Sequence, residues 1–212
     1  MRLIPLGVDV NHFYPTPDIG LHIRHSLAWE EQGAPVIGYL GRLVSEKGLD
    51  LLMQVLNRLQ TPWRALFVGA GPMEAALRTW ASRYPETVQI CTDVKHRDVP
   101  HYLNAIDILC APSQTMPNWR EQFGRMLIEA FACGVPVIGS DSGEIPHVLR
   151  DASVVVGEKD EQSWAQALSD LLESPLQRTE LAAKGLQQAR TVYAWSLIAK
   201  KYLEFFTELL DR

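Results

Sequence analysis

"PVIGYLGRLVSEKGLDLLMQVLNRLQ", residues 35–60, joins a short run of apolar residues to a longer segment of helical period. The run at 35–41 is apolar at successive positions, which is typical of a strand buried on both faces. The segment at 45–60 has apolar residues three and four positions apart, which predicts an amphipathic helix. A strand followed directly by a helix is the unit from which parallel α/β sheets are built.

The same alternation continues along the chain. Strands are predicted at 64–69, 87–91, 107–112, 135–140 and 152–157, and helices at 72–84, 99–106, 123–133 and near 144–150. Buried strands separated by helices predict a doubly wound, Rossmann-like α/β domain with a parallel sheet covered on both faces. Ligands of such sheets bind at the carboxyl ends of the strands.

Three regions follow from this pattern. Residues 1–34 resemble a linker, with an irregular connector expected at 16–34. Residues 35–158 form the Rossmann-like core. Residues 159–212 are predicted to be C-terminal helices, beginning at a capping Asp160 and interrupted before Pro175.

Composition excludes several classes of function. The net charge of −5 provides no basic surface for nucleic acid or anionic lipid. No apolar run approaches the ~18 residues of a transmembrane helix. The three cysteines are scattered beside apolar residues, which is typical of reduced thiols in a cytoplasmic protein. No Cys or His pair has ligand spacing, so no metal site is predicted.

The turn after the first strand carries two cations, Arg42 and Lys47, and Ser45 is expected to cap the following helix. A cation in the first turn of a helix is disfavoured by the helix dipole, and an anionic partner would remove that conflict. Gly41 permits a tight turn there. From the residues alone, a phosphate ligand and two solvated charges beside Glu46 have equal weight.

Gly69 and Gly71 follow the next strand and open a helix, as in half of a dinucleotide fingerprint, and Asp93 lies near the distance expected for a ribose ligand. The third glycine is absent, so a plain strand-to-helix turn is favoured. A nicotinamide-dinucleotide oxidoreductase domain is retained as an alternative.

The segment 121–146 contains two carboxylates eight residues apart, Glu121 and Glu129. The apolar stripe of its helix comprises Phe123, Met126, Leu127, Ala130 and Phe131. Glu129 points away from that stripe, which favours a solvated side chain. Glu121 precedes the helix in a loop at the carboxyl end of a strand, where a carboxylate suits sugar or ribose hydroxyls. For Glu121 ligand contact and solvation have equal weight.

Two other patterns are set aside. "GSDSGEIP" is not a hydrolase elbow, because Asp141 occupies the position of the nucleophilic serine. The histidines form no cluster in the sequence and are predicted to be structural or superficial: His12, His22, His25, His96, His101 and His147.

Taken together, several segments resemble family 4 retaining glycosyltransferases of GT-B architecture. They are "IPLGVDVNHFYP", "GRLVSEKG", "FVGAGP", "CAPS", "EQFGRMLIEAFACGVPVIGS" and "SGEIPHVL", in that order over about residues 4–211. The resemblance implies transfer of a sugar from a UDP-, GDP- or ADP-sugar with retention. It also implies that the chain is the C-terminal, donor-binding half, so that an N-terminal acceptor domain is absent.

The resemblance also implies roles for individual residues. Arg42 and Lys47 would hold the donor diphosphate, which Gly41 lets the backbone approach, and Glu129 would bind the ribose hydroxyls. Arg42, Lys47 and Glu121 would be the catalytic group.

Three further residues complete the implied donor site. Glu121 would contact the donor sugar together with backbone amides around Phe123 and Gly124. Val94 follows the strand at which the family recognises the base. The family's "GG-x-P-E" reads "GEIPH" here, so no role passes to Glu144 or His147.

Four expectations concern the whole protein. Without an Asp-x-Asp motif, catalysis is expected to need no metal or other cofactor. The chain alone is expected to transfer little sugar, and to reach a membrane only peripherally through the absent half. Apolar residues of the last helix are expected to be exposed or to form a homodimer. A noncatalytic nucleotide-sugar-binding subunit remains the other alternative.

Overall fold

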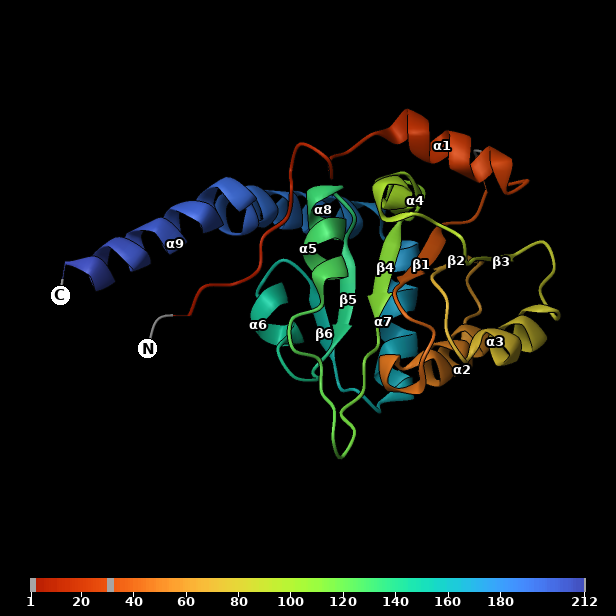
Figure 1. The fold of residues 1–212 in the computed structure, drawn as a ribbon. Coiled ribbons are helices and arrows are strands. Elements are labelled where there is room, and N and C mark those ends of the chain that lie inside the picture. The colour runs from red at the N-terminus through yellow and green to blue at the C-terminus, as the bar shows by residue number, and fades with distance from the viewer. Residues whose placement is uncertain (1–2, 30–32, 212) are drawn as a thin grey trace.

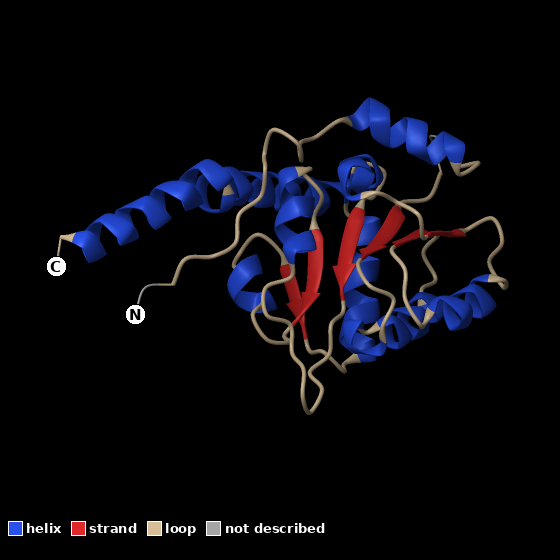
Figure 2. Cartoon of the chain, in the orientation of Figure 1, coloured by secondary structure: helices blue, strands red, loops and turns tan. Residues whose placement is uncertain are grey.

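A computed structural model describes residues 3–29 and 33–211 of the chain. Its centre is a six-stranded parallel sheet in the order β3-β2-β1-β4-β5-β6 (Figures 1 and 2). The strands are β1 Val36–Leu40, β2 Arg64–Val68, β3 Val88–Cys91, β4 Ile108–Ala111, β5 Val137–Ser140 and β6 Val154–Val156. This strand order is that of a doubly wound sheet whose direction of winding reverses between β1 and β4. The predicted fold class is confirmed.

Helices cover both faces of the sheet. The α-helices are α1 Pro17–Ser26, α2 Leu49–Arg58, α3 Glu74–Ala81, α4 Val99–Leu103, α5 Arg125–Ala132, α6 Ile145–Leu149, α7 Glu161–Glu173, α8 Pro175–Gln188 and α9 Trp195–Leu210. One apolar cluster joins the sheet to α2, α3 and α7, and a second joins the other face to α4, α5 and α6. Trp164 and Phe131 are among the largest fully buried side chains of these two clusters. Burial on both faces is why the strands are apolar at successive positions.

The helix expected at 45–60 is wrong at its start. Residues Ser45–Lys47 form a 3-10 turn, η1, and α2 begins only at Leu49, after Gly48 adopts a left-handed conformation with φ of 73°. Ser45 makes no capping hydrogen bond. A side chain at Gly48 would overlap the carbonyl of Pro112, so the turn is set by its close approach to the end of β4.

The irregular connector expected at 16–34 is also wrong where the structure describes it, because residues 17–26 form α1. Pro17 is compatible with a first helical position, where its missing N–H is not needed. The Arg24 Nη2 to Asp107 Oδ2 distance is 2.9 Å, which ties α1 to the start of β4. Residues 30–32 lie outside the described residues.

The C-terminal helices follow the prediction closely. The Asp160 carboxylate accepts a 3.0 Å hydrogen bond from the Ser163 N–H and caps α7 as expected. A π-helical turn at Ala189–Tyr193, η3, joins α8 to α9. The Val8 N–H donates to the Tyr193 carbonyl at 2.8 Å, so the N-terminal segment is anchored where α9 begins.

Helix α9 projects from the body of the domain (Figure 1). Leu203, Phe206 and Leu209 are each at least half exposed on it. Within the described part of the chain, no helix has the length and apolar character needed to cross a membrane.

Candidate functional site

The candidate site lies at the carboxyl ends of β1 and β4, where the sheet reverses its direction of winding. The turn after β1, residues 121–124 at the end of the loop after β4, and α5 line a cleft of about 740 Å³. Seven of the eight predicted site residues line it, and Val94 is the exception. The position agrees with the general rule for ligands of doubly wound sheets.

Lys47 and Glu121 meet at the centre of this cleft. The Lys47 ammonium donates to Glu121 Oε2, and the two side chains are only 14% and 9% exposed. Ser113 Oγ donates to the same carboxylate oxygen at 3.1 Å. The Lys47 ammonium also lies 5.1 Å from the ring centroid of Trp119. Lys47 therefore already has an anionic partner within the chain itself.

The backbone of Glu121 is fixed by the loop before α6. The Glu144 N–H donates to the Glu121 carbonyl at 3.0 Å. Gly143 has a φ of 56°, and any side chain there would overlap that same carbonyl oxygen. The glycine therefore allows the two loops to touch, which fixes the backbone that carries the Glu121 carboxylate.

Glu129 is buried at 6% exposure, so the prediction of a solvated side chain is wrong. Helical periodicity identifies the stripe that faces the sheet, but η2 (His96–Asp98) and the N-terminal segment reach the opposite side of α5. Burial raises the pKa of Glu129, and the charges of Arg125, His96 and His12 oppose the rise. A buried carboxylate with acceptor capacity facing a cleft suits a ligand with hydroxyl donors.

Arg42 is an exposed cation of the site, with 66% of its side chain accessible and Glu46 Oε1 3.6 Å from its guanidinium. Its backbone is more firmly held, since the Tyr39 hydroxyl donates to the Arg42 carbonyl at 2.6 Å. Burial raises the pKa of Tyr39, and the nearby Glu121 carboxylate raises it further. Tyr39 is therefore a neutral donor that supports the turn.

Gly69 and Gly71 have a structural function. A side chain at Gly69 would overlap the Gly41 carbonyl, and one at Gly71 would overlap the Leu43 carbonyl. The Gly41 and Leu43 N–H groups donate to the carbonyls of Val68 and Ala70, each at 2.9 Å. These glycines allow the turns after β1 and β2 to pack together, as a plain strand-to-helix connection requires.

The helix that opens into the cleft is α5. Gly124 precedes it with φ of 74°, and both Phe123 and Gly124 line the cleft. The Phe123 ring packs edge-on against Tyr193 of η3, with centroids 6.0 Å apart. Free N–H groups at the start of α5 can receive an anion.

Two residues that the sequence did not single out belong to the site. His96 lines the cleft opposite Glu129, and Trp119 contacts Lys47. No local pattern identifies His96, because a turn after β3 brings it to the cleft. Trp119 is only two residues before Glu121, and an aromatic beside a candidate sugar ligand was an available signal. Val94 packs against the core instead.

In the residues that the structure describes, no three His, Cys, Asp or Glu side chains converge as a metal site would require. Cys110 and Cys133 are buried free thiols, and Cys91 is a partly buried one. Burial raises the pKa of all three.

Cations, buried carboxylates and a helix N-terminus at the switch point of a doubly wound sheet define a nucleotide-binding class of domain. Residues 25–188 match the family model of the glycosyl transferases group 1, and the chain belongs to that family. The resemblance found in the sequence is confirmed, and the match does not favour the dinucleotide oxidoreductase.

Three comparisons illustrate the family. The chain is 31% identical, over 93% of its length and 54% of the relative's, to a GDP-mannose-dependent monoacylated alpha-(1-6)-phosphatidylinositol monomannoside mannosyltransferase from Corynebacterium glutamicum. It superposes on sucrose-phosphate synthase from Thermosynechococcus elongatus with a TM-score of 0.84, at 25% identity, covering 99% of the chain and 53% of that structure.

A third similar structure is the C-terminal domain of a glycosyl transferase group 1 family protein from Francisella tularensis. The TM-score is 0.73 at 22% identity, covering 89% of the chain and 99% of that domain. The chain spans about half the length of the curated relatives that it matches.

Proposed function

We propose that this chain is the donor-binding part of a retaining glycosyltransferase, and that the cleft between the β1 turn and α5 binds a nucleotide-diphosphate sugar. The observation that carries the proposal is the convergence of two cations, Arg42 and Lys47, and two buried carboxylates, Glu121 and Glu129, on one cleft. Cations suit a diphosphate, and carboxylates suit the hydroxyls of the two sugar rings.

The diphosphate would lie between the β1 turn and the start of α5. Arg42 is exposed and able to reach it, and Gly41 leaves room for the backbone to approach. The N–H groups following Gly124 would add donors at a helix N-terminus, which favours negative charge. Lys47 would be the buried cation of this group.

Each of the two carboxylates would bind one of the two sugar rings of the ligand. Glu129, on α5 and near His96, would accept hydrogen bonds from the ribose hydroxyls. Glu121, in contact with Lys47, would accept from the hydroxyls of the donor sugar, near the amides of Phe123 and Gly124. Val94, after β3, would lie toward the base, although its side chain is packed against the core.

The chemical contribution would be electrostatic. When the bond from the anomeric carbon to the diphosphate breaks, negative charge develops on the leaving phosphate. Arg42, Lys47 and the start of α5 would stabilise that charge in the transition state. Three such donors would replace a divalent cation, so we propose a reaction that needs no metal.

Transfer would require a second domain. The chain spans about half of its curated relatives, and an acceptor must be positioned and water excluded at a closed cleft. We therefore infer that acceptor binding, and any peripheral contact with a membrane, belong to another part of the protein. The homodimer through α9 stays a prediction.

Calorimetric titration of the chain with UDP, GDP, ADP and NAD tests the donor site. GDP is included because a relative depends on GDP-mannose, and UDP is included because the similar Anabaena HepE structure contains it. Saturable binding of one nucleoside diphosphate, weakened at least about tenfold in Arg42→Ala and in Glu129→Ala, supports the proposal. Arg58→Ala is the matched control, since Arg58 pairs with Glu161 away from the cleft. Binding of NAD instead, or no effect of either cleft variant, would contradict it.

A further inference from the structure

The pairing of Lys47 with Glu121 neutralises the charge of both residues in the cleft. Both side chains are almost inaccessible, although they line a cleft large enough for a ligand. The Ser113 hydroxyl also donates to this carboxylate, with its Oγ 3.1 Å from the same oxygen. The buried cation of the site is thus neutralised before any ligand arrives.

An entering diphosphate must therefore compete with Glu121 for Lys47. If Lys47 turns to the phosphates, Glu121 keeps the Ser113 hydroxyl as its side-chain donor among the described residues, within a largely buried environment. A buried carboxylate that loses its cation is strongly destabilised unless other donors replace it. A free nucleoside diphosphate has no group beyond its terminal phosphate to provide those donors.

An intact nucleotide sugar provides them. Its hexose follows the terminal phosphate directly and carries several hydroxyl donors, which a carboxylate accepts. We propose that the Lys47–Glu121 pair makes the cleft select the intact nucleotide sugar over the free nucleoside diphosphate. When the diphosphate pairs with Lys47, the sugar hydroxyls donate hydrogen bonds to Glu121. This exchange involves non-covalent partners only. This inference rests on the proposed donor site.

Trp119 is a positioning residue in this exchange. Its ring lies 5.1 Å from the Lys47 ammonium, so it attracts the cation independently of Glu121. It is carried by a hairpin, residues 112–124, in which Met116 and Trp119 pair, and this hairpin is attached to the domain by two hydrogen bonds. The Gln114 N–H donates to the Glu46 carbonyl at 2.8 Å, and the Thr115 N–H donates to Glu158 Oε2 at 2.7 Å. Trp119 can therefore keep Lys47 beside the cleft when Glu121 releases it.

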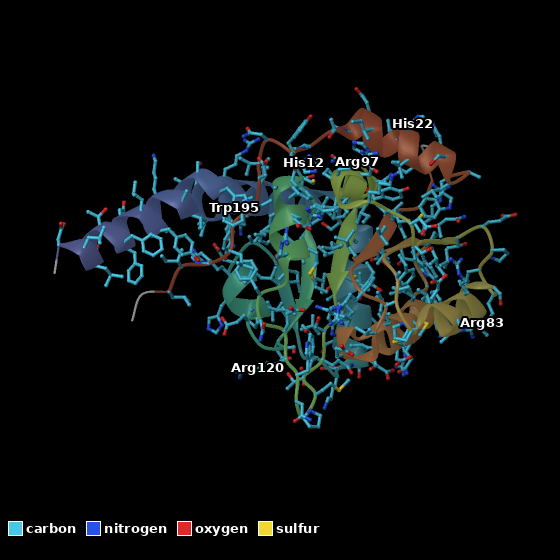
Figure 3. All side chains as sticks on the ribbon, in the orientation of Figure 1. His12, His22, Arg83, Arg97, Arg120 and Trp195 are labelled. Atoms are coloured by element: carbon cyan, nitrogen blue, oxygen red, sulfur yellow. The ribbon has the colours of Figure 1, made fainter. Side chains whose placement is uncertain are left out.

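The hairpin also places Glu121 between two hollows. A second hollow, of about 700 Å³, is lined by residues 115–122 and Glu144, and it shares Glu121 and Gln122 with the cleft. The hairpin extends past the ends of the strands, and Figure 3 shows Arg120 at that end of the molecule. A hexose that reaches Glu121 from the cleft thus has open space beside it.

The same pair would help the product to leave. Once the sugar is transferred, Glu121 loses its hydroxyl donors and attracts Lys47 again. The diphosphate then loses a cation, which weakens its binding. The pair therefore favours donor over product at the same site without any movement of the backbone.

Calorimetry with matched ligands on the full chain tests the inference. UDP is compared with UDP-glucose, and GDP with GDP-mannose, for the unaltered chain, Glu121→Gln and the control Glu180→Gln. Glu180 loses the same charge, but it is an exposed residue of α8 and lines neither hollow. We expect the unaltered chain to bind one intact donor at least about fivefold more tightly than its nucleoside diphosphate.

In Glu121→Gln the nucleoside diphosphate should bind about tenfold more tightly, because Lys47 is no longer neutralised. The ratio of the affinity for the intact donor to that for the nucleoside diphosphate should then fall towards one. Glu180→Gln should change neither affinity more than about twofold. In Trp119→Leu both ligands should weaken together, which leaves the preference unchanged.

Three outcomes would overturn the inference. Equal or weaker binding of the intact donor by the unaltered chain would do so without any variant, which covers a failure of Glu121→Gln to fold. Unchanged or weaker diphosphate binding in a folded Glu121→Gln would do so while leaving the donor site supported by the Arg42→Ala result. No binding of any nucleotide would overturn both the donor site and this selectivity.

Discussion

Glu129 lies one helical turn after Arg125 on α5, and its Oε1 is 3.5 Å from the Arg125 Nη2, yet only the arginine is exposed. The side chains are 8% and 61% accessible, respectively. The guanidinium thus remains in solvent while the carboxylate is held inside the cleft. Such a long, solvent-exposed contact compensates burial only in part, which agrees with burial being the main influence on the pKa of Glu129.

The first prediction concerns pH. Because burial raises the pKa of Glu129 above its usual 4.5, the folded chain binds more protons at this site than the unfolded chain just above that pH. The contribution of Glu129 to the free energy of unfolding should therefore fall as pH rises through its folded pKa. Glu129→Gln should be more stable than the unaltered chain at pH 7, and the difference should shrink towards pH 4.

Urea denaturation from pH 4 to pH 8 measures this difference, with the exposed carboxylate variant Glu180→Gln as the control. If Glu129→Gln is less stable than the unaltered chain at pH 7, this contradicts the conclusion that burial raises the pKa of Glu129. The same variant should bind the nucleoside diphosphate more weakly, so at this residue ligand-free stability and binding are expected to oppose each other.

The second prediction concerns the contact between two loops. Gly143→Ala should lower the free energy of unfolding by about 1–3 kcal/mol, because its φ of 56° is unfavourable for alanine and the new methyl group overlaps the Glu121 carbonyl. Thermal denaturation measures the loss. In Gly157→Ala the added carbon would be 3.5 Å from Asp160 Cβ, an ordinary contact, so that variant should change little. Equal effects of the two substitutions would argue against the loop contact.

The third prediction concerns the core. Trp164 on α7 is fully buried, and its indole N–H donates to the Gly157 carbonyl at 3.1 Å. Trp164→Ala should cost about 3–5 kcal/mol, as expected for removal of a large buried aromatic side chain. Trp195→Ala, at a position 49% exposed at the start of α9 (Figure 3), should cost less than about 1 kcal/mol. Chemical denaturation of both variants gives the comparison, and similar losses would contradict the packing described for α7.

The fourth prediction concerns activity. The chain alone should bind a nucleotide sugar and transfer little or none of it, because an acceptor site and a closed cleft are required for transfer. Addition of a separately produced N-terminal domain of the family should restore transfer, measured by release of nucleoside diphosphate. Transfer by the chain alone at rates typical of enzymes would refute the requirement. Binding without any transfer, even after this addition, would favour a noncatalytic subunit.

The sequence predicted the strands well because each is short and mostly apolar, and the central strands are buried on both faces. It failed at residues whose conformation depends on distant groups. The turn at Gly48 follows from the Pro112 carbonyl, which approaches from another strand. Helix α1 was mistaken for a connector because a Thr-Pro-Asp start signals a turn and a helix equally well.

For the site, the sequence located the two cations and Glu121 at the ends of strands but misjudged Glu129. Helical periodicity describes which side of α5 faces the sheet, and it contains no information about what packs on the other side. His96 was missed for the same reason, since it reaches Glu129 only through the arrangement of β3 relative to α5.

The sequence by itself therefore determined the fold class and the family, because alternating apolar periods and linked motifs are local properties of the chain. Only the tertiary structure decided which charges of the site are paired and which are buried. Lys47 and Glu121 are 74 residues apart, and their pairing requires β1 and β4 to be neighbours in the sheet. Burial of Glu129 likewise requires separate segments to meet over α5. Charge neutralisation and burial depend on such long-range contacts, and local sequence patterns do not encode them.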